Sequence, residues 1–255
     1  VITRATFQAV DAFDIVGQQS TTTLPDCEID LFGQGGNGKP SLEEFFRKTE
    51  HTRLMWWPQE GVHRMEVWKA TIVPQTKGTK EDPYEEFPRV LGSQYLPQWV
   101  AGGVLTMLRN WMMPGLRGKI TRWFVKHVYP AIVRKFEPLD GKKGPMKFRD
   151  TWMHGLPMDN SAYDQLMPTR FIELWIAIEK CPEVMQALRE VYQKNGIWAT
   201  GTYSCEIYPT PASKYWMSAA YGRDVVKVDV FWFGKNKGDP IAHFYPQFWE
   251  ALKQF

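Results

Sequence analysis

Two glutamates and one arginine are the residues of this chain whose surroundings suggest chemistry. Glu173 lies in the apolar run 170–179, and Glu206 lies in the apolar run 203–208. A carboxylate among bulky apolar neighbours needs a partner or takes a raised pKa. Arg223 precedes a third apolar run. If the strands that carry the two glutamates are neighbours, both carboxylates share one sheet face, with Arg223 at its rim.

Such a set of side chains suits the handling of a hydroxyl group. A carboxylate accepts a proton or orients a hydroxyl, and an arginine stabilises developing negative charge. Glu173, Glu206 and Arg223 are therefore candidate catalytic residues. A structural ion pair or a solvent-facing position is the alternative for each of them. The aromatic residues proposed to line the cavity and bind substrate are Trp56, Trp57, Trp175, Tyr208 and Tyr221.

Common catalytic and cofactor motifs are absent from the sequence. No Cys or His cluster has metal-ligand spacing, which predicts that there is no metal site. The sequence has no Gly-x-Ser-x-Gly elbow and no Gly-x-Gly-x-x-Gly between a strand and a helix. Glycines recur over residues 33–38, but no Gly-Lys-Ser/Thr follows them. We therefore predict a flexible polar loop over residues 17–40.

The elements that must position these residues begin with a strand–helix–strand unit. The run 170–179 is rich in bulky and β-branched residues and lacks Gly and Pro, which predicts a central strand. Pro182 and Glu183 indicate the start of a helix, which ends at Asn195-Gly196. A second strand follows over residues 203–208.

The remaining sequence predicts further strands and helices around this unit. Strands are predicted over residues 1–16, 51–57, 62–73, 214–220 and 225–233, and helices from Ser41 and over residues 95–113, 116–136 and 245–255. Pro130 should kink or split the helix that contains it. We predict one α+β domain, with a large, mainly antiparallel mixed sheet and helices packed on one face.

Composition limits the classes of function. The chain has 255 residues, 44% of them hydrophobic, and a formal net charge of +3, which is too small to indicate nucleic-acid binding. Its 12 Trp fit either a core or a pocket for a large apolar or ring-shaped ligand. Three cysteines form neither a disulfide framework nor a metal set. No apolar run is long enough to span a membrane, and the absence of an initiator Met suggests a piece of a longer protein.

One segment is strongly basic. Residues 114–149 contain ten Lys or Arg and two acidic residues, a net charge of +8. Three interpretations are open: a solvated helix face, a docking surface for an acidic partner domain, and a contact with an anionic membrane. Within this segment, residues 116–136 have an apolar stripe at helical spacing, which should face the core. His127 lies on that stripe and is interpreted as a core histidine.

Several aromatic blocks carry a resemblance to a known family. They are Trp56-Trp57-Pro58, Val67-Trp68-Lys69, Leu166-Met167-Pro168, the run 171–176, Tyr215-Trp216-Met217-Ser218, the run 228–233 and the run 244–249. These blocks resemble the substrate-binding domain of class II cholesterol oxidases, which are flavoenzymes of the vanillyl-alcohol-oxidase type. Sugar-lactone oxidases are similar in architecture. The resemblance covers residues 51–255.

The resemblance implies that residues 1–255 form the substrate-binding (cap) domain of an FAD-linked oxidase. Its sheet would cover the flavin ring of a separate domain, which binds most of the FAD and lies outside this chain. A sterol 3-hydroxyl would be oxidised, with hydride passing to FAD and electrons to O2. The family also implies a glutamate near the hydroxyl and a Glu-x-Arg gate. This chain has no Glu-x-Arg, and Tyr221 stands two residues before Arg223.

Partners and alternatives follow from these expectations. The expected partners are the FAD-binding domain of the same enzyme and an apolar alcohol or sterol, with membrane-surface contact as a further option and no nucleic acid. The resemblance slightly favours a secreted or periplasmic location. The alternatives are the substrate domain of a sugar-lactone oxidase and a non-enzymatic, basic module that binds membranes or a partner.

Overall fold

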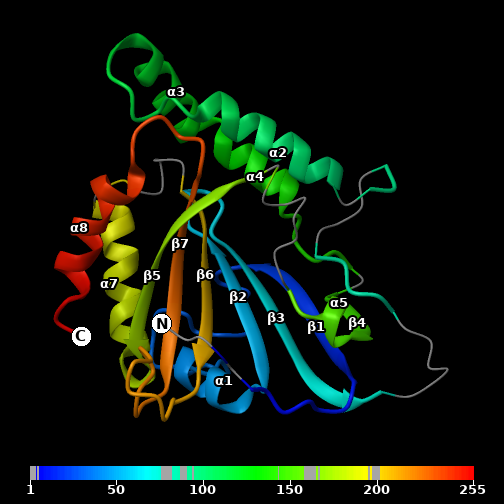
Figure 1. The fold of residues 1–255 in the computed structure, drawn as a ribbon. Helices are drawn as coiled ribbons and strands as arrows, with labels where there is room; N and C mark the ends of the chain where they lie inside the picture. The colour runs from blue at the N-terminus through cyan, green and yellow to red at the C-terminus, as the bar shows by residue number, and fades with distance from the viewer. Residues whose placement is uncertain are drawn as a thin grey trace.

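The fold is built on one large antiparallel sheet (Figure 1). The computed structural model describes residues 4, 6–75, 82–86, 91–93, 95–142, 144–157, 165, 167–194, 196 and 202–255, apart from the side chains of Pro97 and Tyr203. Within these residues, seven strands pair in the order β4-β1-β3-β2-β6-β7-β5. Every pairing between them is antiparallel. The α+β class predicted from the sequence is confirmed.

The bounds of the elements are as follows. The strands are β1 (Phe13–Thr23), β2 (His51–Trp57), β3 (Arg64–Pro74), β4 (Met146–Thr151), β5 (Thr169–Ala177), β6 (Thr202–Thr210) and β7 (Val225–Phe233). The helices are α1 (Leu42–Lys48), α2 (Tyr95–Leu108), α3 (Gly115–His127), α4 (Tyr129–Phe136), α5 (Trp152–Gly155), the 3-10 helix η1 (Ile178–Lys180), α7 (Cys181–Lys194) and α8 (Pro240–Leu252). None of the helices in the described ranges combines the length and apolar character that crossing a membrane requires.

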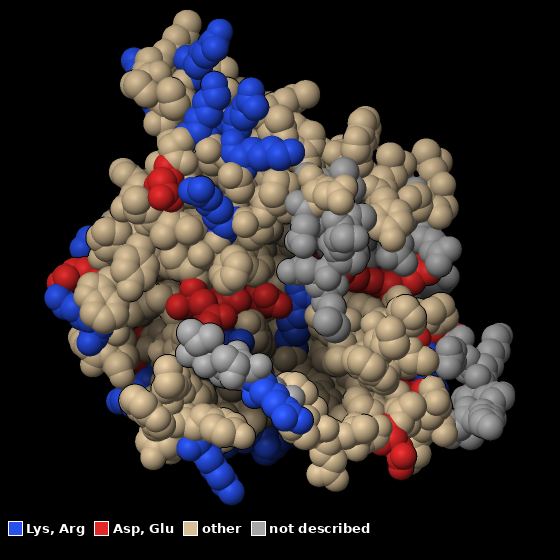
Figure 2. Space-filling view, viewed as in Figure 1, with Lys and Arg blue, Asp and Glu red and all other residues tan. Residues whose placement is uncertain are grey.

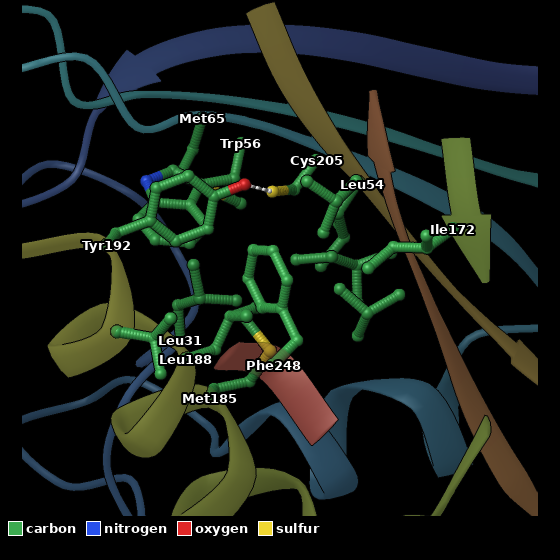
Figure 3. Close-up of a cluster of buried hydrophobic side chains, with 14 of the residues drawn as sticks. Leu31, Leu54, Trp56, Met65, Ile172, Met185, Leu188, Tyr192, Cys205 and Phe248 are labelled. Atoms are coloured by element: carbon green, nitrogen blue, oxygen red, sulfur yellow. Dashed lines mark hydrogen bonds between the residues drawn. The ribbon is translucent and has the colours of Figure 1, made fainter. Parts of the chain in front are cut away.

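One face of the sheet packs against α1, α7 and α8 and forms the main core. In Figure 1, α7 and α8 lie at the left, beside β5, and we call the face of the sheet opposite to these helices the open face. Figure 3 shows Trp56 and Cys205 of the sheet side by side with Tyr192 of α7, whose hydroxyl lies 2.9 Å from the Cys205 thiol. Phe248 of α8 packs edge-on against Tyr192. The core therefore joins helices to strands through interlocking aromatic rings.

Local sequence signals explain where the helices begin. Ser41 and Glu44 form the predicted capping box of α1, since the Ser41 hydroxyl accepts from the Glu44 amide at 3.2 Å and the Glu44 carboxylate accepts from the Ser41 amide at 3.1 Å. Helix α8 begins earlier than predicted because Asp239 caps it, accepting from the Ile241 amide at 3.0 Å. The predicted helix over residues 116–136 is split into α3 and α4, as Pro130 indicated.

The strand predicted to be central is an edge strand. β5 pairs with β7 alone among the described strands and ends the sheet. Ile172 and Ile176 point into the core, whereas Phe171 and Trp175 on the other face are 50% and 38% exposed. The run 170–179 is therefore apolar on both sides because its open face carries aromatic rings, and not because the strand is buried on both sides.

The predicted loop over residues 17–40 is partly strand and partly buried chain. β1 extends to Thr23, so only residues 24–40 connect it to α1. In that connection Cys27, Ile29 and Leu31 are at most 2% exposed and belong to the core. The prediction of a flexible loop was wrong. It gave weight to the many polar and glycine residues and overlooked these three alternating apolar residues, which pack in the core.

Other differences are local. Residues 214–220 form turns instead of the predicted strand, and Tyr215, Trp216 and Met217 are exposed there. β4 was not predicted, because its alternation of apolar and charged side chains covers only Met146 to Arg149. Before β1, the described residues 4 and 6–12 form no strand, in contrast to the prediction for residues 1–16.

Gly17 in β1 provides a test of how tightly the open face is packed beside β4. A Cβ atom at this position would lie 2.6 Å from the Ala70 Cβ and 2.7 Å from the Phe148 ring. We expect Gly17→Ala to lower the free energy of unfolding by about 1–3 kcal/mol, because overpacking forces neighbours to shift. Gly103→Ala is the control, since nothing lies within 4 Å of its Cβ position in α2. That change should raise stability by up to about 1 kcal/mol. Urea unfolding measures both, and equal effects would contradict the packing argument.

Candidate functional site

A row of carboxylates crosses the open face of the sheet. Glu173 of β5 pairs with Asp229 of β7, and Asp229 pairs with Glu206 of β6. Glu206 in turn lies opposite Met55 of β2, which lies opposite Glu66 of β3. Residues paired across strands project from the same face. Glu173, Asp229, Glu206 and Glu66 therefore share the open face, and we call them the carboxylate row.

The space-filling view shows that this face is hollowed. In Figure 2, acidic side chains gather over the middle of the sheet at the edge of a hollow, and basic side chains lie deeper within it. The view is that of Figure 1, where α7 and α8 lie at the left, so these two helices do not cover the hollow. The sheet is therefore not packed shut on both sides.

Arg53 of β2 holds one part of the carboxylate row together. Its guanidinium pairs with Glu206 at 2.5 Å and with Glu86 at 3.1 Å. The three side chains are only 14–19% exposed. Burial opposes the charge on Arg53, but Glu206, Glu86 and Glu66 outweigh it and raise the pKa of Arg53 above its ordinary value. The guanidinium is therefore a permanent positive charge within the hollow.

Glu66 connects the carboxylate row to β1. Burial raises the pKa of Glu66 to about 7, against the lowering effect of Arg53. Gln19 of β1 donates to Glu66 at 3.0 Å and accepts from the Tyr84 hydroxyl at 2.6 Å. Tyr84 also packs on Phe148, with ring centroids 4.8 Å apart. The segment 82–86 therefore covers the β1, β3 and β4 end of the open face.

Asp229 lies between Glu173 and Glu206 in the carboxylate row. The residue is 3% exposed, and burial, with Glu173 and Glu206 nearby, raises its pKa to about 7. The Tyr208 hydroxyl donates to Asp229 at 3.2 Å, and burial beside the carboxylates raises the pKa of Tyr208 above its ordinary value. The Oδ1 atom of Asp229 makes no hydrogen bond within the described part of the chain. Asp229 thus has one free acceptor atom and titrates near neutral pH.

Lys227 is held between aromatic rings beside this aspartate. Its ammonium lies 4.1 Å from the Tyr208 ring centroid and 4.9 Å from that of Trp175. It also lies 3.8 Å from the Glu173 carboxylate, to which the Trp175 indole N–H donates. A cation between two rings and a carboxylate is fixed in position while its charge stays available.

The structure brings some of the predicted site residues together. Glu173, Trp175, Glu206 and Tyr208 all lie on the open face. The two glutamates, however, do not lie on neighbouring strands, because β7 separates β5 from β6. Asp229 of β7 therefore lies between the two glutamates on the open face.

Arg223 and Tyr221 lie before β7, and of the carboxylate row only Glu173 shares a pocket with Arg223. Arg223 lines a pocket of about 270 Å³ at the outer edge of β5, together with Glu173 and Trp175. The α8 side of this pocket is lined by Trp249. Tyr221 is 55% exposed in the turn before β7. Arg223 thus shares a pocket with Glu173 but not with Glu206.

The two adjacent tryptophans point to opposite sides of β2. Trp56 is 1% exposed in the main core, where it packs edge-on against Phe32 and Tyr192. It does not reach the open face, so we do not retain it as a substrate contact. Trp57 is paired with Arg64 on the open side but lies at the strand end and packs against the core. Neither side chain lines the hollow beside Asp229.

Sequence reasoning missed Arg53, Lys227 and Asp229. Lys227 and Asp229 alternate with valines in β7, which already indicated a polar face. Arg53 is the one charged residue of the apolar strand β2 apart from His51. What the sequence did not provide was the strand order, and only that order places these residues beside Glu206.

Two amides of the glycine-rich run 33–38 are already engaged within the loop. Phosphates bind free amide groups in glycine-rich turns. In the run 33–38, the Gly35 amide already donates to Asp30 at 3.2 Å, and the Gly36 amide donates to the Lys39 carbonyl at 2.9 Å. Within the described part of the chain, no group of three or more His, Cys, Asp or Glu could hold a metal ion.

The raised pKa of Asp229 predicts a pH-dependent stability difference. Its pKa in the folded state lies above the unfolded value of 3.8, so the ionised form is disfavoured by folding. The stability from this group is complete below about pH 4 and is lost as the pH rises toward about 7. Asp229→Asn cannot ionise, so its free energy of unfolding should rise relative to wild type by about 1–3 kcal/mol between pH 4 and 8. Parallel stability curves in urea unfolding would contradict this.

Glu206→Gln is the matched change in the carboxylate row, and it should change the free energy of unfolding in the opposite direction. It removes the charge that pairs with the buried Arg53 guanidinium. We expect it to lower the free energy of unfolding at pH 7 by about 1–3 kcal/mol, because a charged donor loses its ionised partner. A stability equal to wild type would show that Glu86 alone satisfies Arg53.

Comparison with known proteins identifies the family. A search of curated proteins finds no match to this chain. A family model described as D-arabinono-1,4-lactone oxidase matches residues 5–255, which is nearly the whole chain. The match supports the sugar-lactone alternative better than sterol oxidation, and the resemblance to cholesterol oxidases is confirmed only at the level of FAD-linked oxidases. The chain belongs to the D-arabinono-1,4-lactone oxidase family of FAD-linked oxidases.

Proposed function

We propose that this chain is the substrate-binding part of an FAD-linked oxidase of the sugar-lactone type. The FAD would be bound mainly by a domain outside these residues, and the open face would lie over the flavin ring. The observation that carries the proposal is the concentration of hydrogen-bonding groups in the hollow of the open face, in a chain that matches a lactone oxidase family.

The chemistry of the hollow favours a polar substrate. Lys227 supplies N–H donors, the Tyr208 hydroxyl, whose hydrogen goes to Asp229, supplies an acceptor, and the Oδ1 atom of Asp229 is a buried acceptor close to both. A polyhydroxylated lactone needs several such groups arranged around it. A sterol needs a long dry cavity, and unpaired charges buried against its rings would be costly. The open face therefore fits a sugar derivative better than a sterol.

The residues of this chain can orient a substrate hydroxyl and accept its proton. With a pKa of about 7, Asp229 is partly ionised at neutral pH, which suits a general base. Lys227, fixed on the Tyr208 ring, would stabilise an oxygen that gains negative charge. FAD in such an oxidase supplies the acceptor for the hydride, and that part of the reaction lies outside the described residues.

The substrate class is tested by a panel of alcohols. The chain is co-expressed with its FAD-binding region, and reduction of O2 or of an artificial acceptor is measured with aldono-1,4-lactones, alditols and sterols. We expect turnover with lactones and none with sterols. Turnover with sterols alone would restore the cholesterol-oxidase interpretation. If the protein retains its flavin but turns over no compound of the panel, both the sugar-lactone and the sterol interpretation are wrong.

Lys227→Met tests whether the open face binds the substrate. Methionine keeps an unbranched side chain on the Tyr208 ring but removes the charge. We expect kcat/KM for the best lactone to fall about tenfold to a hundredfold, as for the loss of a charged hydrogen bond. Lys253→Met is the control, since Lys253 pairs with Glu250 on the surface of α8. Equal kcat/KM values for the two variants would show that the substrate does not bind next to Lys227 of β7.

A further inference from the structure

The helices α2, α3 and α4 differ in charge from the rest of the chain. Between residues 95 and 136 there are seven Lys or Arg and no Asp or Glu, although the whole chain contains 28 acidic residues. Helix α2 carries no charged side chain at all. The positive charge is therefore concentrated on α3, α4 and their connections, and no acidic residue lies within this stretch of the sequence.

Helix α3 presents apolar side chains to the solvent. Its packed side consists of Gly118, Thr121 and Val125. Leu116, Ile120 and Trp123 recur at four- and three-residue steps on the opposite side and are 73%, 59% and 59% exposed. We call these three residues the apolar ridge. The stripe that the sequence placed toward the core thus points outward, and His127 at its end is exposed as well.

Cationic side chains border the apolar ridge. Lys119 and Lys126 lie along one side of it and Arg117 lies on the other, and all three are exposed. Arg122 differs, because it donates to the carbonyls of Trp111 and Met113 at 2.7 and 3.2 Å and so anchors α3 to the preceding turn. Three cations are therefore positioned to meet an anionic partner, and one has a structural role.

Helix α2 adds exposed aromatic and apolar groups next to α3. The two helices are in contact. Tyr95, Trp99 and Met107 of α2 are 55%, 64% and 78% exposed. Tryptophan and tyrosine beside Lys and Arg are the residues enriched where a protein meets the lipid headgroups.

The position of these helices leaves the open face clear. Figure 1 shows α2 and α3 across one end of the sheet, beyond the strand ends. In Figure 2, a group of Lys and Arg side chains gathers at the end where α3 lies, away from the hollow. A contact made through α3 therefore need not block the carboxylate row.

We propose that α2 and α3 bind the surface of an anionic lipid membrane, with the apolar ridge inserted between headgroups. Charge complementarity selects an anionic partner. The ridge then selects lipid, because it is a convex row of apolar side chains that a bilayer interface can accommodate. A nucleic acid would use the cations but leave the ridge in water, and a folded acidic protein would need a matching groove.

Co-sedimentation of the intact chain with vesicles tests the proposal. The vesicles contain phosphatidylcholine alone or with about 30% phosphatidylserine, and salt is varied, since surface attraction is screened by ions. We expect binding to the anionic vesicles only, weakening as salt rises. Lys119→Gln combined with Lys126→Gln should reduce it at least tenfold. The control is Lys180→Gln combined with Lys214→Gln, which changes the charge equally at exposed sites elsewhere and should bind like wild type.

A second pair of substitutions separates insertion from simple charge attraction. Ile120→Ser and Trp123→Ser keep every cation but remove the apolar ridge, and they lie on the side of α3 that does not pack on the protein. We expect both to reduce binding to anionic vesicles at least fivefold with an unchanged urea midpoint. Binding that is unaffected by these changes, equal binding to neutral vesicles, or no binding at all would each overturn the proposal. Retention on an immobilised polyanion without vesicle binding would assign the surface to another acidic partner.

Discussion

The ion pairs of Arg53 are the constraint on which the open face depends. Glu206, Glu86 and Glu66 lie on separate segments of the chain, and their negative charges would repel one another if no cation lay between them. The guanidinium offers several donors in a fixed plane, so that one residue pairs with Glu206 and Glu86 at once. The positions of β2, β3, β6 and the segment 82–86 are thereby linked through one side chain.

The same strands serve two purposes on their two faces. In β7, Val226, Val228 and Val230 fill the core while Lys227 and Asp229 face the hollow. A shift of the register by one residue would expose the valines and bury the charges. The core therefore fixes the geometry of the polar groups, and the polar groups contribute to selecting the register. Rigid strands are a precise support for such groups, because their side chains leave the sheet at fixed intervals.

The sequence predicted most of the elements and part of the site. Alternating valines located β7, and capping residues located α1, because these signals are local. The position of β5 at the edge, and of β7 between the two glutamates, depends on strand order, which is set by contacts far apart in sequence. The position of Trp56 in the main core was not predicted, because adjacent residues in a strand point to opposite faces and the sequence did not show which face packs on helices.

The half-covered open face limits the shape of what can enter. The segment 82–86 closes the β1, β3 and β4 end, where Tyr84 lies on Phe148, while the β5 end remains uncovered and aromatic, with Trp175 at 38% exposure. Among the described residues, the open face is therefore covered at one end and carries exposed aromatic rings at the other. Across the sheet from β5, Lys227 and Asp229 of β7 come first, and the hydrogen-bonded pair of Gln19 and Tyr84 stands at the covered end. A ligand on the open face would therefore lie nearer to β5 and β7 than to β1 and β4.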